Sequence, residues 1–360
     1  MSDVLMLSAI VMLVLLFLKV PVYIAVLGGS MVYFVLNPDI NAVVFAQQAI
    51  IGTEKISLMA IPFFICAGIF MNYTGVTKRI MDFCEVVTGR LPGGLAQVNV
   101  LLSTVMGGLS GSNIADAAME SKMMVPEMTK KGFSLEFSSV VTAASSMITP
   151  LIPPGIAMIL YGCIANVSIG KLFISGFGVG GLLCITMMIL VGFISKKRGY
   201  GNLTTEKLTW PRFWKAFKPA VLPLLLPIII IGGIRIGIFT ATEAGAVAIL
   251  YAALLGIIYR EMHVKDMVQG LKETVCSTAS IMLIVSAASV FSWILTKERI
   301  PQTLTAWMLA NIHSKFVFLI VVNVFLLLVG MFIEGNASMI ILVPLLAPIA
   351  AEYGINEIEF

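Results

Sequence analysis

Two short polar stretches interrupt an otherwise apolar sequence, and each carries oxygen atoms of the kind that bind small cations. The first, GGLSGSN, supplies the hydroxyls of Ser110 and Ser112 and the amide of Asn113. The second, GMFIEGN at residues 330–336, contains Glu334. Hydroxyl, amide and backbone carbonyl oxygens suit a hard cation such as Na⁺. The residue types therefore indicate ion-binding chemistry at these two interruptions.

The two stretches also share a spacing. Each begins with glycine, places asparagine six residues later and precedes a segment that contains Val-Pro. Apolar segments that glycine or proline interrupts in corresponding positions of two halves point to the midplane site of a transporter. Within hydrocarbon, unwound backbone persists only where protein surrounds it or where it lines a cavity. The sequence therefore predicts two repeats, each with a broken helix beside a solute site.

A third interruption is rich in proline. Residues 149–155 read TPLIPPG, in which Pro150, Pro153 and Pro154 lack backbone donors and clash with the preceding helical turn. An unbroken helix cannot pass through them, and the apolar flanks indicate a break at membrane depth. We expect Thr149 and the prolines to border the solute site; a kinked structural helix is the alternative.

Three acidic residues fall within or beside apolar sequence. Glu243, which follows Thr242, lies in the segment FTATEAGA, and Asp116 and Glu334 lie at the two glycine-containing interruptions. A carboxylate inside the membrane is costly and is usually functional. For Glu243, a structural pair with Arg235 or a place in an interfacial loop remains open. Glu334 is the strongest candidate, because the sequence on both sides of it is uncharged.

Ser110 also fits GxSG, a short pattern found in rhomboid-type intramembrane serine proteases. That chemistry requires a base within hydrogen-bond reach of the serine. His263 and His313 both lie in polar segments, which argues against it. A phosphate-binding GxxxxGKS/T motif is absent from the sequence, so ATP hydrolysis is unsupported. We therefore expect a protein that is not an enzyme; the protease and a non-transporting membrane scaffold are the alternatives.

The composition indicates what kind of protein positions these residues. Hydrophobic residues make up 59% of the 360 and charged residues only 12%, whereas a soluble domain has roughly 25% charged residues. Apolar stretches approach the ~20 residues that a helix needs to cross a membrane, and strand alternation is absent. The sequence therefore predicts an all-α polytopic membrane protein. The net charge of +4 is typical of cytoplasmic loops and does not indicate binding of nucleic acid.

A basic segment divides the chain at residues 196–218, which the positive-inside rule places in the cytoplasm. Aromatic residues recur there at helical spacing: Trp210, Phe213, Trp214 and Phe217. This pattern predicts an amphipathic helix that lies against membrane lipid. The other expected parts are scaffold helices (1–57), a first repeat (58–195) with a hairpin at about 91–130 and a broken helix at 149–155, scaffold helices of the second half (219–275), and a second repeat (276–360) with a tip near 334.

Together, several segments resemble the large membrane subunit of TRAP transporters, the DctM-like family. They are LMAIPFFICAGIFMNYTGVTKRI (58–80), GRLPGGLAQVNV (89–100), GGLSGSNIADAA (107–118), TPLIPPG (149–155) with VSIGKLFISG (167–176), and TATEAGAVAILYA (240–252). Members of this family continue into a second broken helix with a TPPxG motif, whereas this sequence stops at YGINEIEF. The second-half counterpart of TPLIPPG is therefore missing from the sequence.

The resemblance implies an elevator-type transporter with inverted repeats and two re-entrant helical hairpins in the inner membrane of a bacterium or archaeon. It implies import of a carboxylate-bearing solute, such as a C4-dicarboxylate, sialic acid or another sugar acid. Sodium symport drives that import, with no cofactor besides the coupling ion. It further implies two partners, a small four-helix membrane subunit and a periplasmic substrate-binding protein.

The resemblance also assigns roles residue by residue. Sodium ligands are expected at Ser110, Gly111, Ser112, Asn113, Glu334 and Gly335. Solute contacts are expected at Ser110, Ser112, Asn113, Thr149, Pro153, Pro154 and Asn336. Asp116 lies just beyond the first tip, and family members commonly carry aspartate in place of Glu334.

Overall fold

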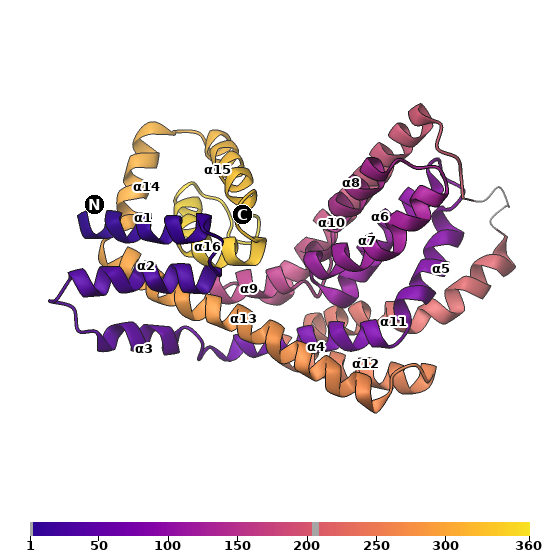
Figure 1. Cartoon of the computed structure of the whole chain (residues 1–360), viewed down its shortest axis with the longest axis horizontal. Coiled ribbons are helices and arrows are strands. Elements are labelled where there is room, and N and C mark those ends of the chain that lie inside the picture. The colour runs from indigo at the N-terminus through magenta and orange to yellow at the C-terminus, as the bar shows by residue number, and fades with distance from the viewer. Residues whose placement is uncertain (1–2, 204–208) are drawn as a thin grey trace. The chain divides into compact units, whose positions relative to one another are not determined.

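The computed structural model describes residues 3–203 and 209–360, and within these ranges it contains helices and no strand (Figure 1). This confirms the predicted all-α class. The α-helices are α1 (Asp3–Phe17), α2 (Val22–Leu36), α3 (Val43–Ile51), α4 (Ala60–Tyr73), α5 (Val76–Thr88), α6 (Gly94–Ser110), α7 (Asn113–Lys130), α8 (Leu135–Ser145), α9 (Ile156–Ala165), α10 (Ile169–Arg198), α11 (Trp210–Ile236), α12 (Ala241–Tyr259), α13 (Val264–Lys297), α14 (Ile300–Asn311), α15 (Lys315–Gly330) and α16 (Gly335–Glu352). Short 3₁₀ turns occupy Ile56–Met59 and Thr149–Leu151.

Several helices are long and apolar enough to cross a membrane. Among the described residues there are 6 such helices, or up to 7 when the bent pair Leu135–Leu151 and Ile156–Ala165 is counted as one span. The two parts of that pair meet at 46°. Shorter apolar helices, among them α1, α2, α6 and α15, accompany these spans. The chain therefore has the helices of a polytopic membrane protein.

The chain forms two compact units. We call Met59–Ile159 with Ser168–Val275 the α6 unit, and Met1–Leu58 with Leu160–Val167 and Cys276–Phe360 the α16 unit. The helices α9 and α13 contribute residues to both units. The first glycine-containing interruption and the proline-rich one lie in the α6 unit, and the second glycine-containing interruption lies in the α16 unit.

Helix α6 forms the centre of the α6 unit. It packs against α4, α5, α7, α8, α10 and α11, and most of its residues are buried. A helix that is apolar around most of its circumference needs such surroundings, because each face must be covered. Gly68 on α4 permits a close approach: a Cβ atom there would lie 3.0 Å from the carbonyl oxygen of Leu109. The end of α6 is therefore held against α4.

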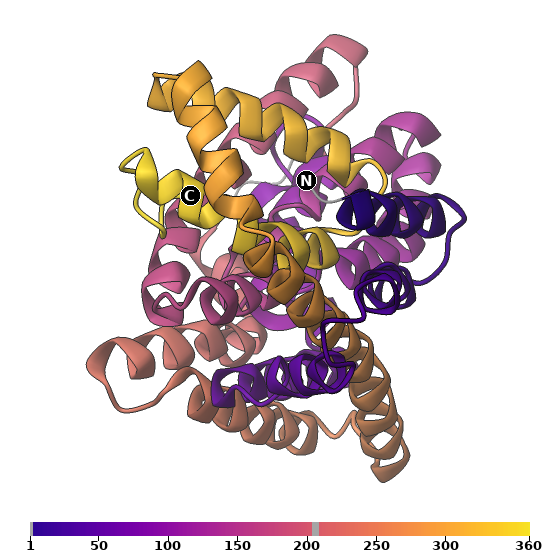
Figure 2. The same cartoon turned by 90° about the vertical axis from the view of Figure 1, so that its left-hand side faces the viewer.

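The α16 unit has separate apolar clusters. One joins α14, α15 and α16, where the rings of Phe318 and Tyr353 stack with centroids 4.4 Å apart. Figures 1 and 2 both show these helices gathered near the C-terminus. A second cluster joins α2 and α13 through Tyr33, Phe34 and Val290, and α1 packs along α2. These clusters hold α13 and α16 in place, and both helices line the cavity described below.

The aromatic residues of the basic segment begin a longer helix. Helix α11 extends without interruption from Trp210 to Ile236, with three prolines inside it. The rings of Phe213 and Phe217 pack on Phe83, with centroids 5.9 and 5.7 Å away, whereas Trp210 is 70% exposed. The amphipathic stretch is thus the N-terminal part of α11. Residues 204–208, which include the basic-segment residue Lys207, lie outside the described residues.

Candidate functional site

The first glycine-containing interruption separates two helices by two residues. Helix α6 ends at Ser110, Gly111 has a left-handed backbone (φ 61°), and α7 begins at Asn113. Glycine adopts this backbone conformation without the penalty that a Cβ atom would bring. Ser112 is the N-cap of α7, and its hydroxyl accepts the backbone N–H of Ala115 at 3.4 Å. We call Ser110–Asn113 the first tip.

The first tip lies against the proline-rich interruption. The carbonyl oxygen of Gly111 accepts the N–H of Ile156 at 3.3 Å. A Cβ atom on Gly111 would lie 2.5 Å from the carbonyl oxygen of Pro154, and one on Gly107 would lie 2.8 Å from that of Thr149. The peptide between Pro153 and Pro154 is cis. Two interruptions that the sequence predicted separately are thus in backbone contact within the α6 unit.

Buried acidic side chains lie next to this contact. The Thr149 hydroxyl donates to Asp116 Oδ2 at 2.6 Å and lies 3.2 Å from the carbonyl oxygen of Ser103. The Ser103 hydroxyl donates to Glu120 Oε2 at 2.6 Å. Asp116 and Glu120 are 1% and 0% exposed, and one oxygen of each has no partner among the described residues. Glu120 was not among the residues predicted from the sequence; its position four residues after Asp116, on the same face of α7, was the available signal.

The Ser110 hydroxyl is buried and has no hydrogen-bond partner among the described residues. In particular, no described histidine donates to it or accepts from it. The ring Nδ1 of His263 lies 3.3 Å from an Asp266 carboxylate oxygen, and His313 is exposed. Among the described residues, no histidine therefore provides the base that a serine nucleophile requires.

Glu243 has a local structural contact. It forms a capping box at the start of α12: its carboxylate accepts the backbone N–H of Thr240 at 2.7 Å, and the Thr240 hydroxyl accepts the N–H of Glu243 at 3.3 Å. None of the ion pairs among the described residues joins Glu243 to Arg235. Thr242 is partly exposed in the same first turn. A capping box stabilises the start of a helix by satisfying backbone donors.

The second glycine-containing interruption separates α15 from α16. Glu334 is the N-cap of α16, and its Oε2 accepts the N–H of Ala337 at 3.1 Å. We call Glu334–Asn336 the second tip. Glu334 therefore has the same capping role as Ser112. The two asparagines that the sequence repeat aligns differ by one position relative to their helix starts. Asn113 is the first residue of α7, whereas Asn336 is the second residue of α16.

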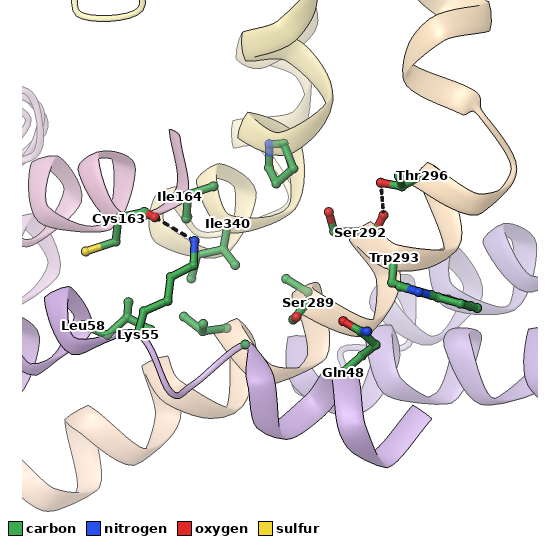
Figure 3. A pocket seen from close by; sticks show the side chains of 14 residues that line it. Gln48, Lys55, Leu58, Cys163, Ile164, Ser289, Ser292, Trp293, Thr296 and Ile340 are labelled. Carbon is green, nitrogen blue, oxygen red and sulfur yellow. Dashed lines mark hydrogen bonds between the residues drawn. The ribbon is translucent and has the colours of Figure 1, made fainter. Parts of the chain in front are cut away.

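A cavity of about 310 Å³ lies within the α16 unit (Figure 3). Its polar lining includes Lys55, Gln48 and the serines Ser289 and Ser292 of α13. The Nζ atom of Lys55 donates to the carbonyl oxygen of Cys163 at 3.1 Å. None of these residues was predicted from the sequence. The available signals were a lysine directly before an apolar span, next to Glu54, and the hydroxyl residues Ser289, Ser292 and Thr296, which lie three and four positions apart on one helix face.

Comparison with known proteins decides the family. Residues 9–360 match the family described as the DctM component of the tripartite ATP-independent periplasmic transporter. The chain belongs to this family. It is therefore a TRAP-transporter large permease and a multi-pass membrane protein. Because the family consists of transporter components, the membership also supports the expectation that this permease is not an enzyme.

Named relatives cover most of this permease. The sialic acid TRAP transporter large permease protein SiaM of Vibrio cholerae is 39% identical over 347 residues, which are 96% of this chain and 81% of the relative. The 2,3-diketo-L-gulonate TRAP transporter large permease protein YiaN of Escherichia coli is 34% identical, over 92% of this chain and 78% of the relative. The C4-dicarboxylate TRAP transporter large permease protein DctM of Pseudomonas aeruginosa is also 34% identical, with the same two coverages.

Close packing beside the cavity of the permease yields a stability prediction. A Cβ atom on Gly52 would lie 2.4 Å from the Cβ of Ser289, so alanine at this position must push the end of α3 away from α13. We expect Gly52→Ala to destabilise the α16 unit by about 1–3 kcal/mol. Thermal unfolding of the purified protein in detergent measures this change. Gly330→Ala is the matched control, because nothing lies within 4 Å of its added Cβ; an equal loss of stability in both variants would contradict the prediction.

Proposed function

We propose that this permease imports a carboxylate-bearing solute together with Na⁺ by an elevator movement of the helices that carry the two tips. The family membership and the three named relatives support this proposal, because sialic acid, diketogulonate and C4-dicarboxylates all carry carboxylate groups. The observation that carries it is the break of two residues between α6 and α7, packed against the proline-rich interruption.

The first tip has atoms that suit a co-transported sodium ion. Ser110 presents a buried hydroxyl without a partner among the described residues. The helix end at Ser110 also leaves backbone carbonyl groups without intrahelical donors. Ser112 and Asn113 add further neutral oxygens beside this end. We propose these residues and Gly111 as ion ligands of the first tip, and Glu334 with Gly335 as those of the second tip.

The N-termini of α7 and α16 suit the solute. Each has free backbone N–H groups and the positive end of a helix dipole, which favour a carboxylate. Within the α6 unit, we propose Ser110, Ser112 and Asn113 with Thr149, Pro153 and Pro154 as solute contacts. Within the α16 unit, we propose Asn336. A bound ion orders the tips and adds a positive charge beside the solute, so that the anionic solute binds the ion-loaded state more tightly. Coupling then follows from this difference in affinity.

The proposed transporter acts with partners. A periplasmic binding protein delivers the solute, and a small four-helix membrane subunit assembles with this permease in the inner membrane. The description of the family as one component of a tripartite periplasmic transporter supports this arrangement.

Flux measurement tests the proposal. The permease is reconstituted into proteoliposomes with both partners, and solute uptake is followed with and without an inward sodium gradient. We expect Ser112→Ala, Asn113→Ala and Glu334→Ala each to lower sodium-driven uptake by about tenfold or more, which corresponds to about 1.4 kcal/mol of lost ion or solute binding. Exposed Ser139, whose hydroxyl donates to its own helix at Leu135, provides the control Ser139→Ala.

Two outcomes would contradict the proposal at different levels. Normal sodium-dependent uptake by all three variants would remove these residues from the site. Uptake that is absent from the wild-type protein with both partners present would favour a non-transporting scaffold. Because Ser112→Ala also removes a helix cap, Ser112→Thr accompanies it; threonine retains a capping hydroxyl.

A further inference from the structure

The cavity of the α16 unit is lined by chemistry that the transport proposal does not use. Four segments surround it: the stretch from α3 to the 3₁₀ turn at Ile56, the end of α9, the second half of α13, and α16 (Figure 3). Its volume of about 310 Å³ lies at the lower end of the range for small-molecule sites. All lining residues belong to the α16 unit.

Lys55 is the single charged residue among the 14 that line the cavity. Its ammonium has three donors, and the structure uses one of them for the carbonyl oxygen of Cys163. None of the ion pairs among the described residues includes Lys55. An anion that enters the cavity therefore meets one positive charge and no acidic lining residue.

Neutral donors and acceptors lie beside this charge. Ser289 and Ser292 occupy one face of α13, and Gln48 faces them from α3 (Figure 3). No hydrogen bond joins these three side chains to another described residue. Thr296, one turn further along, is already engaged, since its hydroxyl donates to the carbonyl oxygen of Ser292 at 2.9 Å. The cavity thus offers hydroxyl and amide groups that are available to a ligand.

Apolar side chains complete the lining: Leu58, Ile164, Val285, Ala288, Trp293 and Ile340. This combination of an apolar wall with a few polar groups is typical of small-molecule sites. One cation matches one carboxylate, and the unpaired serine and glutamine side chains match hydroxyl groups. A second carboxylate would lie in the cavity without a counter-charge, which is unfavourable.

We propose that this cavity binds a hydroxylated monocarboxylic acid of the sugar-acid type, with its carboxylate on Lys55 and its hydroxyl groups on Ser289, Ser292 and Gln48. The proposal rests on the transport function, because its ligand is the imported anion. The cavity is a second place that holds this anion, and its lining shares no residue with the solute contacts proposed above. It also assigns a preference: a polyhydroxylated monocarboxylate binds more tightly than a dicarboxylate.

The experiment measures binding to the purified full chain in lipid nanodiscs by isothermal titration. The probes are gluconate and N-acetylneuraminate as hydroxylated monocarboxylates, succinate as a dicarboxylate, and glucitol as the uncharged analogue of gluconate. We expect at least one sugar acid to bind, with succinate and glucitol weaker by about tenfold or more. Lys55→Met weakens sugar-acid binding by about ten- to a hundredfold, because a charge-assisted hydrogen bond is lost, and Lys55→Arg retains most of it.

Further variants separate a binding role from a structural one. Ser289→Ala keeps the charge and weakens sugar-acid binding by several-fold. Lys315→Met removes an exposed lysine elsewhere in the α16 unit and leaves binding unchanged. Equal binding by Lys55→Met and wild type, succinate as tight as the sugar acids, or no sugar-acid binding to wild type would each overturn the proposal.

Flux measurement distinguishes this inference from the transport proposal. Normal sodium-driven uptake of a sugar acid by Lys55→Met overturns the cavity assignment and leaves the transport proposal intact. Sugar-acid binding that depends on Lys55, combined with no sodium-driven uptake by wild type, overturns the transport proposal and leaves the cavity as a binding site.

Discussion

Alanine in place of Gly111 is expected to abolish sodium-driven uptake and to lower the thermal stability of the permease. Two penalties add at this position. The left-handed backbone (φ 61°) costs an alanine roughly 1–2 kcal/mol. The new Cβ atom would also lie 2.5 Å from the carbonyl oxygen of Pro154, a backbone atom that moves only if the proline-rich interruption moves with it.

The close contact with the Pro154 carbonyl oxygen is expected to lower both stability and uptake, because it displaces the first tip. Overpacking of this kind typically costs about 1–3 kcal/mol, so the total loss is about 2–5 kcal/mol. Displacement of the first tip also separates the carbonyl of Gly111 from the N–H of Ile156, which are 3.3 Å apart. Thermal unfolding in detergent and uptake in proteoliposomes measure the two effects.

Gly132→Ala is the matched control for this prediction. Gly132 also has a left-handed backbone (φ 88°), but nothing lies within 4 Å of an added Cβ atom. It therefore isolates the backbone penalty from the contact penalty. If the two variants lose the same stability and retain the same uptake, the contact between the first tip and the proline-rich interruption contributes neither to stability nor to transport.

The second large effect is the loss of stability expected when the hydrogen bond between Thr149 and Asp116 is removed. Their hydrogen bond (2.6 Å) is buried, and Thr149 and Asp116 are 0% and 1% exposed. Thr149→Val leaves a buried carboxylate oxygen without its donor. Asp116→Leu removes the closer acceptor of the Thr149 hydroxyl, which keeps only the carbonyl oxygen of Ser103 at 3.2 Å. We expect each change to cost about 1–3 kcal/mol, and the double variant to cost less than the sum by about 1 kcal/mol or more.

A double-mutant cycle of unfolding in mixed micelles measures this coupling. Asp116→Leu combined with Thr186→Val is the control, because the exposed Thr186 hydroxyl donates within its own helix to Leu182. Those two changes should add without coupling. Additive behaviour in the Asp116–Thr149 cycle as well would show that the bond does not hold α7 to the proline-rich interruption.

Local sequence was enough to predict where the helices break. Glycine at position 111 permits a left-handed backbone, and the prolines at 153 and 154 remove donors, whatever surrounds them. The structure has its helix ends at these positions. The capping roles of Ser112 and Glu334 also depend on local sequence, because each side chain accepts the N–H of the residue three positions later. From the sequence alone, these side chains were predicted only as ligands. The family could be recognised from the same short motifs.

Other features depend on residues that are distant in the chain. Thr149 meets Asp116 across 33 residues, and Lys55 meets Cys163 across 108. The backbone preferences of a residue do not specify such partners, since these follow from how whole helices pack. The sequence by itself thus determined the all-α membrane class, the family and the positions of the breaks, because these depend on hydropathy and on local backbone rules. Only the tertiary structure decided which break meets which, and that Lys55 shares a cavity with the serines of α13, because packing between distant helices brings those groups together.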